Sequence, residues 1–191
     1  ARRVIFEHAI LRVIGSPVET SEGVREYLRL EIPDWVNVVG VTQDAELILV
    51  RQRRHGIDAE TLEIPGGCVD PGEAPADAAA RELLEETGFG DGEWRPLGWV
   101  WSNPAIQNNR THLFLASGLR LLGPPQLGPG EADLRVELAA HGQADMGHHL
   151  AHDLCRAGFV FGVQHRPDKA DGDRFHAFTQ EMAAGVAHVL F

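Results

Sequence analysis

The 191-residue chain lacks the features that mark secreted, membrane and repeat proteins. It has two cysteines, Cys68 and Cys155, which are too few and too far apart for a disulfide framework, so we expect a reducing compartment. It shows no signal-peptide pattern and no run of about 18 apolar residues, which predicts a cytoplasmic protein without a membrane span. Internal repeats are absent, and the length suits one domain with a sizeable core.

Basic residues are scarce as well. The chain has 17 Lys and Arg against 28 Asp and Glu, a formal net charge of −11. This charge argues against a nucleic-acid partner and against binding to an anionic membrane surface. Action on an anionic substrate would therefore require cations gathered at the site, namely metal ions and a local cluster of arginines.

What the chain does have is a segment rich in glutamate and glycine with one arginine, GCVDPGEAPADAAARELLEETGF, at residues 67–89. Pro75 fits a first helical turn, alanine and leucine favour the helix, and Gly88 suits a left-handed C-terminal cap. We therefore expect a helix over residues 74–87. At about 100° per residue, one arc of this helix should face the core. Its members are Ala76, Ala80, Leu83, Leu84 and Thr87.

Three carboxylates lie close together on this helix, those of Glu82, Glu85 and Glu86. Like charges three or four residues apart repel by roughly a few tenths of a kcal/mol per pair, and oxygen ligands suit Mg²⁺ or Mn²⁺. The paired Gly66 and Gly67 before the helix let backbone carbonyls approach a ligand or metal closely. A solvated acidic helix face is the alternative, but it does not explain why the other charged residues and the glycines occur at fixed offsets.

The segment resembles the Nudix box, G-x5-E-x7-R-E-U-x-E-E-x-G-U, where U is aliphatic or aromatic. Every specified position is matched, by Gly67, Glu73, Arg81, Glu82, Leu83, Glu85, Glu86, Gly88 and Phe89. The resemblance implies a Nudix hydrolase, an enzyme that cuts the diphosphate linkage of a nucleoside diphosphate joined to another group. It also implies the α+β fold of that family, an α/β/α sandwich in which helices flank a mixed β-sheet, here with an N-terminal β-hairpin region.

The same resemblance implies roles for individual residues. The metal ligands, for Mg²⁺ with Mn²⁺ as a substitute, would be the backbone carbonyl of Gly66 and the carboxylates of Glu82, Glu85 and Glu86. Arg81 would orient these glutamates through salt bridges, and Glu73 would be a structural partner in the loop before the helix.

Upstream of the box, residues 47–56 and 61–67 resemble the corresponding run of ADP-ribose and nucleotide-sugar pyrophosphatases. In that subgroup Arg53 or Arg54, in a run that also holds Arg51, would contact the substrate diphosphate, and Glu63 would lie near the metals. The guanidinium fork suits a phosphate because it can make two parallel hydrogen bonds. Ordinary solvated charge at a strand end is the alternative for the three arginines.

Downstream, Pro104 lies 15 residues past Phe89, a spacing that resembles the ADP-ribose pyrophosphatase group. The surrounding Asn-Pro-Ala departs from the Ser-Pro-Gly of that group and, with residues 33–39, resembles bacterial nucleotide-sugar hydrolases that accept GDP-mannose and similar compounds. Trp35 is a candidate for stacking on a base, or else a core or dimer-interface residue. Asn108 is a candidate for binding sugar hydroxyls or a base edge, or else a turn residue.

Two further expectations concern the tryptophans and the general base. Trp99 and Trp101 share one strand face, so we expect core packing for both. In ADP-ribose pyrophosphatases the base comes from a loop before a late strand, and the local match is residues 130–136, with Glu131 as the candidate and Glu137 behind it. Glu82 is the alternative base.

The remaining chain is organised around short strands. They are expected over residues 4–14, 24–32, 35–42, 46–52, 61–64, 94–101, 110–117 and 134–138, with a turn over 15–23 and a flexible loop over 118–130. Residues 1–32 resemble the N-terminal strands that exchange between subunits in ADP-ribose pyrophosphatase-like dimers, so we expect a homodimer and a Nudix domain over 33–191. The histidine-rich tail from about residue 141, with helices expected near 144–157 and 173–189, matches the family poorly.

The leading hypothesis is metal-dependent hydrolysis of a nucleotide sugar or ADP-ribose to a nucleoside monophosphate and a sugar phosphate. One rival is a nucleoside triphosphate or dinucleoside polyphosphate pyrophosphohydrolase, which the position of Pro104 and the arginine run disfavour. A rival of another class is a non-catalytic Nudix module that senses ADP-ribose, which the intact glutamates disfavour.

Overall fold

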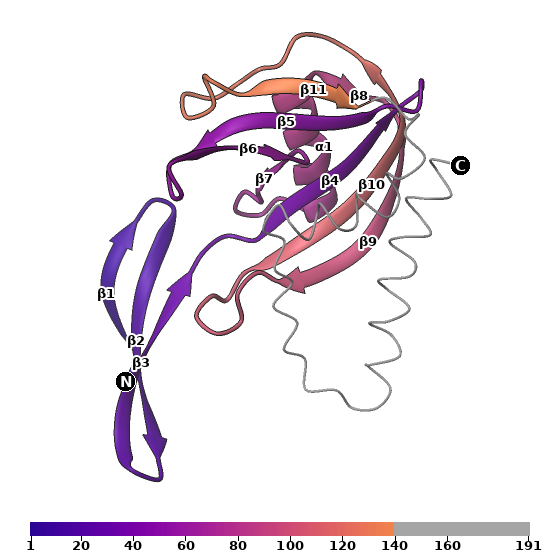
Figure 1. The fold of residues 1–191 in the computed structure, drawn as a ribbon. Coiled ribbons are helices and arrows are strands. Elements are labelled where there is room, and N and C mark those ends of the chain that lie inside the picture. Colours follow the sequence, from indigo (N-terminus) through magenta and orange to yellow (C-terminus); the bar gives the residue numbers. More distant parts are fainter. Residues whose placement is uncertain (140–191) are drawn as a thin grey trace.

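The structure, a computed structural model, describes residues 1–139. Cys155, the histidine-rich tail and the two helices expected there lie outside the described residues. The described part has a small N-terminal sheet and a larger mixed sheet that carries one helix (Figure 1). The N-terminal sheet is formed by β1 (Arg3–His8), β2 (Leu11–Thr20) and β3 (Gly23–Glu31). No helix in residues 1–139 is long and apolar enough to cross a membrane.

The main sheet has eight strands, with β11, β5, β4, β10 and β8 side by side in that order. Its members are β4 (Trp35–Thr42), β5 (Leu47–Arg54), β6 (Ala59–Glu63), β7 (Gly66–Cys68), β8 (Phe89–Gly90), β9 (Glu93–Trp101), β10 (Arg110–Leu121) and β11 (Arg135–Ala139). Strands β6, β7 and β9 pair with β5, β4 and β10. Because β4 and β10 run parallel and the other pairs antiparallel, the sheet is mixed, as expected.

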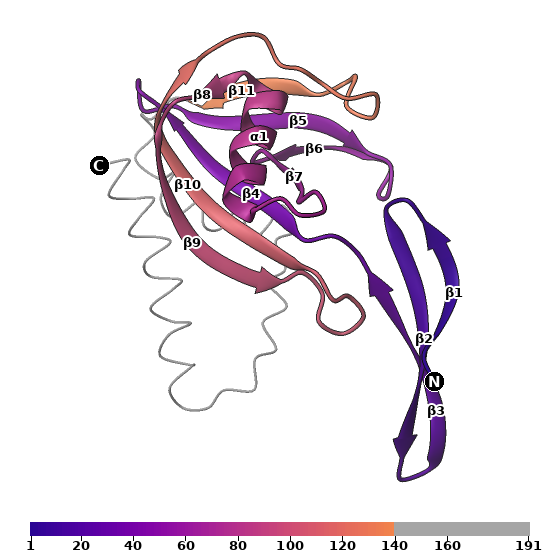
Figure 2. The ribbon, with the colours of Figure 1, turned by 180° about the vertical axis from the view of Figure 1, so that it is seen from behind.

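Helix α1 (Pro75–Thr87) covers one face of this sheet (Figure 2). Alternate strand residues point to opposite faces. One buried cluster joins Ala79 and Leu83 of α1 to Val36, Val38 and Ile48. A second cluster, without any residue of α1, contains Val39, Val41, Leu47, Ile64 and Leu115 and marks the opposite face.

The helix is where expected, but it is turned differently. Gly88 caps it in the left-handed conformation, with φ of 76°. Ala76, Ala80 and Leu84, expected in the core, are exposed, whereas Ala78 and Ala79 are buried. For the two alanines the error has a physical cause, since alanines occur on every side of the first turns and give no hydrophobic contrast there. Glu82 and Glu86 complete the buried side of the helix instead.

The N-terminal strands differ from the expected pattern in two places. A turn at positions 9–10 interrupts the expected strand over 4–14 and divides it between β1 and β2. The expected turn over 15–23 is wrong, because β2 continues to Thr20 and pairs residue by residue with β3. Pro17 is tolerated because the pairing with β1 ends at Gly15, so β2 is an edge strand there and needs no N–H on that side.

The segment after β10 carries a candidate residue to the helix. Strand β10 runs to Leu121, further than expected, and the chain then crosses the C-terminal end of α1. The amide of Leu122 donates to the Gly88 carbonyl at 2.8 Å, and that of Gln126 donates to the Glu85 carbonyl at 2.7 Å. These bonds tie the loop to α1 just before the turn that contains Glu131.

Candidate active site

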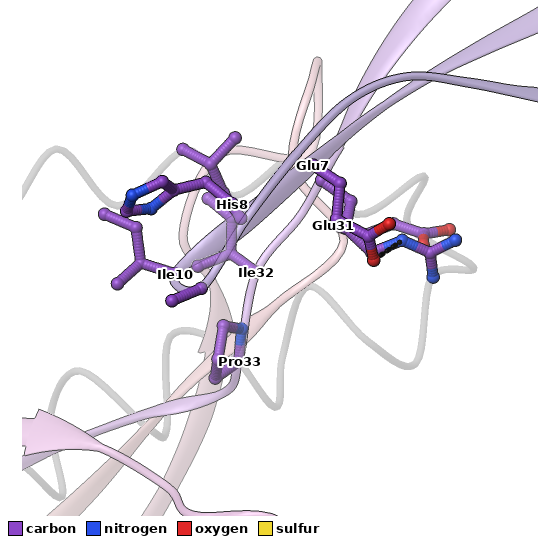
Figure 3. A pocket seen from close by; sticks show the side chains of 9 residues that line it. Glu7, His8, Ile10, Glu31, Ile32 and Pro33 are labelled. Atoms are coloured by element: carbon purple, nitrogen blue, oxygen red, sulfur yellow. Dashed lines mark hydrogen bonds and ion pairs between the residues drawn. The ribbon is translucent and has the colours of Figure 1, made fainter.

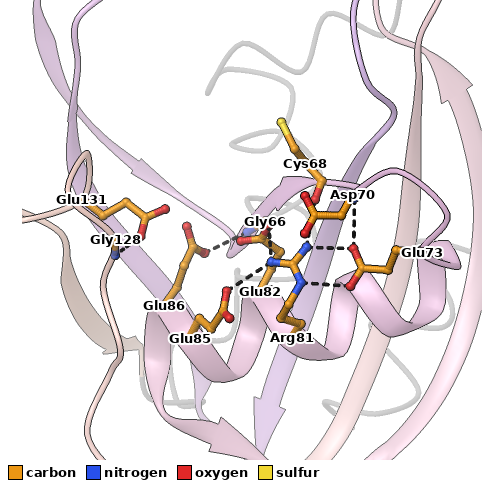
Figure 4. Close-up of polar contacts among 10 residues, drawn as sticks. All are labelled: Gly66, Cys68, Asp70, Glu73, Arg81, Glu82, Glu85, Glu86, Gly128 and Glu131. Atoms are coloured by element: carbon orange, nitrogen blue, oxygen red, sulfur yellow. Dashed lines mark hydrogen bonds and ion pairs between the residues drawn. The ribbon is translucent and has the colours of Figure 1, made fainter. Parts of the chain in front are cut away.

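Arg81 links the acidic groups at the centre of the site (Figure 4). Its Nε and Nη2 donate to the two carboxylate oxygens of Glu73, each at 2.9 Å. Its Nη1 donates to Glu82 at 2.9 Å and to Glu85 at 3.1 Å, and Nη2 also reaches the carbonyl of Cys68 at 3.0 Å. One guanidinium therefore fixes the loop before α1 to two turns of the helix.

The glycines before the helix are required for close packing. A Cβ on Gly67 would lie 2.3 Å from the carboxylate carbon of Glu82, and one on Gly66 would lie 2.2 Å from the carbonyl oxygen of Val36. The amide of Gly66 donates to a carboxylate oxygen of Glu86 at 2.9 Å. Strand β7 thus approaches α1 so closely that Glu82 and Glu86 lie directly against its glycine backbone.

Burial sets the charge of these carboxylates. Glu86 is 2% exposed, and burial raises its pKa to about 8, with the charges of Glu82 and Glu131 adding to the rise. The Gly66 amide and the Arg54 charge oppose this rise. Burial also raises the pKa of Glu82, against the hydrogen bond from Arg81. The buried pair is thus short of positive charge.

For Glu73, in the loop before α1, hydrogen bonds outweigh burial and lower the pKa. The hydrogen bonds from Arg81, followed by that from the Asp70 amide, lower the pKa of Glu73 to about 2. Glu73 in turn raises the pKa of Arg81, which therefore stays charged. This ion pair holds the loop at the start of α1 at neutral pH.

Oxygen donors of this kind fit a hard divalent cation. Within residues 1–139, no three His, Cys, Asp or Glu side chains lie in a ready arrangement for a metal ion. The reason is visible in the contacts: Glu82 and Glu85 accept from Arg81, and Glu86 accepts from Gly66. The donor set still suits Mg²⁺ or Mn²⁺, because a cation would relieve the unfavourable ionisation of the two buried glutamates.

The structure brings Glu131 to this site. Its carboxylate accepts the amide of Gly128 at 2.8 Å and lies beside Glu86 in Figure 4. Its charge also contributes to the raised pKa values of Glu82 and Glu86. Glu137 lies elsewhere, where it pairs with Arg51 across β5 and β11.

The three upstream arginines do not share one face of the sheet. Arg54 follows Ile48, Val50 and Gln52 on the face that carries α1, and it pairs with Glu63 at 2.9 and 2.6 Å. The hydrogen bonds from Arg54 and Thr61 outweigh burial and lower the pKa of Glu63. By strand alternation Arg51 and Arg53 point to the opposite face, where they pair with Glu137 and Asp58.

The remaining predicted substrate residues are not in contact with the glutamates. Trp35 points to the face opposite α1, and its Nε1 donates to Asn37 at 3.2 Å. Pro104 is exposed in the loop between β9 and β10. Asn108, in the same loop, accepts the amide of Ile32 at 3.1 Å and so joins the N-terminal sheet to the main sheet.

Two features were missed from the sequence. Trp99 and Trp101 are 43% and 37% exposed, so the expectation of core packing is wrong. Asp34 accepts the amide of Arg110 at 2.8 Å and lies 2.9 Å from Nε2 of His112. The sequence held one signal for this region: Trp99 and Trp101 alternate along one strand, so they share a face. No pattern in the sequence showed that this face is open to solvent.

Comparisons with known proteins agree with this geometry. Residues 33–152 match the NUDIX domain family. The ADP-ribose pyrophosphatase of Bacillus subtilis (strain 168) is 30% identical over 123 residues, which cover 64% of this chain and 66% of that protein. The ADP-ribose pyrophosphatase of Mycobacterium tuberculosis is 31% identical over 127 residues, covering 66% and 58%. The match therefore spans less than two thirds of the length of each of these relatives.

A solved structure shares the fold. The crystal structure of an ADP compounds hydrolase superposes with a TM-score of 0.67, covering 97% of this chain and 92% of that chain, at 24% sequence identity. At this identity the likeness concerns the arrangement of the sheet and helix.

Proposed function

The chain belongs to the NUDIX domain family, and from this we propose that it hydrolyses the diphosphate bond of a nucleoside diphosphate sugar or of ADP-ribose, with a divalent metal ion. The products are a nucleoside monophosphate and a sugar phosphate. The matched relatives named ADP-ribose pyrophosphatase support the substrate class. The observation that carries the proposal is the set of glutamates around Arg81, two of them buried without enough positive charge.

We propose Mg²⁺ as the cofactor, with Mn²⁺ as a substitute. The ligands would be the carboxylates of Glu82, Glu85 and Glu86 and the carbonyl of Gly66. When bound, the metal would activate water and stabilise negative charge on the leaving oxygen. Arg81 keeps the loop and helix in register, and Glu82 and Glu85, which now accept hydrogen bonds from its guanidinium, would supply carboxylate oxygens to the ion.

The protein's own residues have distinct tasks. The Glu131 carboxylate takes the proton of the attacking water, because it lies on a loop beside Glu86 and is not held by a cationic side chain of the described residues. Glu82 is the alternative base. Among the three arginines, Arg54 is the one placed to bind a phosphate oxygen, since it faces the glutamates and can exchange Glu63 for substrate.

A homodimer formed through residues 1–32 completes the proposal. The N-terminal sheet exposes many large apolar side chains: Val4, Ile5, Phe6, Ile10, Val18, Val24, Tyr27 and Leu28. At its junction with the main sheet lies a cavity of 560 Å³, with Ile10, Ile32 and Pro33 beside the charged Glu7 and Glu31 (Figure 3). A second copy would cover this apolar surface and bring a further segment to Trp35, Pro104 and Asn108.

Light scattering on the full chain tests this assembly. We expect a particle of twice the chain mass of 20.9 kDa. A pair of charges placed on the sheet, Tyr27→Asp with Leu28→Asp, should convert it to a monomer, because burying them would cost several kcal/mol. The matched substitution Ile57→Asp, at an exposed apolar residue outside the N-terminal sheet, should leave the dimer unchanged. A monomeric wild-type protein would contradict the dimer.

A substrate panel tests the reaction. We expect hydrolysis of ADP-ribose, GDP-mannose or UDP-glucose with Mg²⁺ and Mn²⁺, and a loss of about a thousandfold on chelation that added Mg²⁺ reverses. Product analysis should show a nucleoside monophosphate. Faster hydrolysis of nucleoside triphosphates would favour the rival pyrophosphohydrolase. Binding of ADP-ribose with no turnover in any metal would favour the sensing module.

A further inference from the structure

Trp99, Trp101 and Arg110 form an open corner where β9 ends and β10 begins, here called the Trp–Arg corner. The two indole rings meet edge to face, with centroids 5.4 Å apart and planes at 84°. The guanidinium carbon of Arg110 lies 4.2 Å from the centroid of Trp99 and 5.2 Å from that of Trp101. The rings fix the plane of the guanidinium while both tryptophans remain accessible.

Arg110 differs from most arginines of the described chain in its lack of a carboxylate. Nine others pair with Asp or Glu: Arg3, Arg12, Arg25, Arg29, Arg51, Arg53, Arg54, Arg81 and Arg120. Within residues 1–139, the only hydrogen bond that Arg110 donates comes from its backbone amide. Among the described residues, therefore, no acceptor occupies its five guanidinium N–H groups, in a chain with net charge −11.

The corner lies on the same face of the sheet as α1. Arg110, His112 and Phe114 are two residues apart along β10 and so point to the same face, and Phe114 packs in the cluster under α1. Trp99 and Trp101 share this face, because Trp99 pairs with His112 and Trp101 with Arg110 across β9 and β10. The Arg110 amide donates to Asp34, whose carbonyl accepts the amide of Val69 at 2.9 Å, one residue beyond Cys68. The corner is thus tied to the loop that Arg81 fixes.

We propose that the Trp–Arg corner binds a nucleoside monophosphate unit, with the phosphate on the free edge of the guanidinium and the base on an exposed indole face. The guanidinium edge makes two parallel hydrogen bonds to a phosphate, and tryptophan presents a flat surface on which a base stacks. The choice of a nucleotide as the ligand rests on the proposed function; the cationic and aromatic character of the site does not.

Tryptophan fluorescence of the full-length protein measures this binding. With EDTA present, AMP or GMP should quench the fluorescence saturably, after correction for nucleotide absorption. Arg110→Gln should weaken the binding at least about tenfold, because it removes a charge-assisted hydrogen bond while keeping both rings. Adenosine should bind at least about tenfold more weakly than AMP for the same reason. Should Arg110→Gln fail to fold, Arg110→Lys replaces it, with a loss of at least about threefold expected from the missing fork.

Arg95→Gln is the matched control, because Arg95 is exposed on β9 outside the corner. It should bind AMP as the wild type does. An equal loss in Arg95→Gln, or wild-type binding in Arg110→Gln, would overturn the proposal. Steady-state hydrolysis in the same samples separates the two proposals. AMP binding that depends on Arg110 without any turnover refutes only the reaction, and normal turnover with binding independent of Arg110 refutes only the corner.

Discussion

Glu86→Gln is expected to remove hydrolysis while preserving the fold, with a fall in kcat of about a thousandfold or more. The carboxylate is buried against the Gly66 amide, and an amide oxygen in its place can still accept that hydrogen bond. What is lost is the negative charge that would hold a divalent ion. Initial rates at saturating Mg²⁺, with circular dichroism as the check on folding, measure the effect.

The same variant should change how stability depends on pH. Because the pKa of Glu86 is raised to about 8, its protonated form favours folding below the ordinary value of 4.5, and this contribution is lost as pH rises toward 8. Without metal, the wild type should therefore lose free energy of unfolding, on the order of a few kcal/mol, between pH 5 and 8 relative to Glu86→Gln. The facing groups that modulate this loss are Glu82, Glu131 and Arg54.

Two comparisons make the Glu86 prediction specific. Mg²⁺ should raise the melting temperature of the wild type at pH 8 and leave that of Glu86→Gln unchanged. Glu131→Gln should keep the Mg²⁺-dependent rise but lose about 10²- to 10⁴-fold in kcat, as expected for a general base. A Glu131→Gln loss below about tenfold would move the base to Glu82. Wild-type turnover in Glu86→Gln would contradict the metal site itself.

The sequence predicted the parts of the site that depend on local backbone geometry. Helix α1, its left-handed cap at Gly88 and the close approach at Gly66 and Gly67 all follow from residue types at fixed spacing. The mixed sheet and the family were predicted as well. These features need no knowledge of what packs against them, which is why a motif of 23 residues was sufficient.

Features that depend on what packs against each face of the sheet were not predictable in the same way. Alternation along β5 requires that Arg54 and Arg53 point to opposite faces, yet only the position of α1 decides that Arg54 is on the face of the glutamates. Likewise Trp99 and Trp101 were correctly placed on one face, but that face is open. The hydrophobic pattern records which residues share a side, and the tertiary arrangement alone determines what covers it.

Arg81→Gln is the second variant with a large expected effect. It should lower the free energy of unfolding by about 2–4 kcal/mol at neutral pH, because three carboxylates and the Cys68 carbonyl lose one shared donor. Hydrolysis should fall by about a hundredfold or more, since the loop and helix that position the glutamates are no longer held in register. Denaturant unfolding and initial rates measure the two effects.

Arg120→Gln is the matched control, because Arg120 pairs with Asp91 where both side chains are more than half exposed. Its cost should stay within about 1 kcal/mol. The pH dependence identifies the partner: the pKa of Glu73 is lowered to about 2 by Arg81, so its stabilising contribution is present above 4.5 and is lost as pH falls toward 2. The difference between wild type and Arg81→Gln should therefore shrink over that range. Equal costs for the two arginine variants would show that Arg81 acts as an ordinary surface charge and does not organise the site.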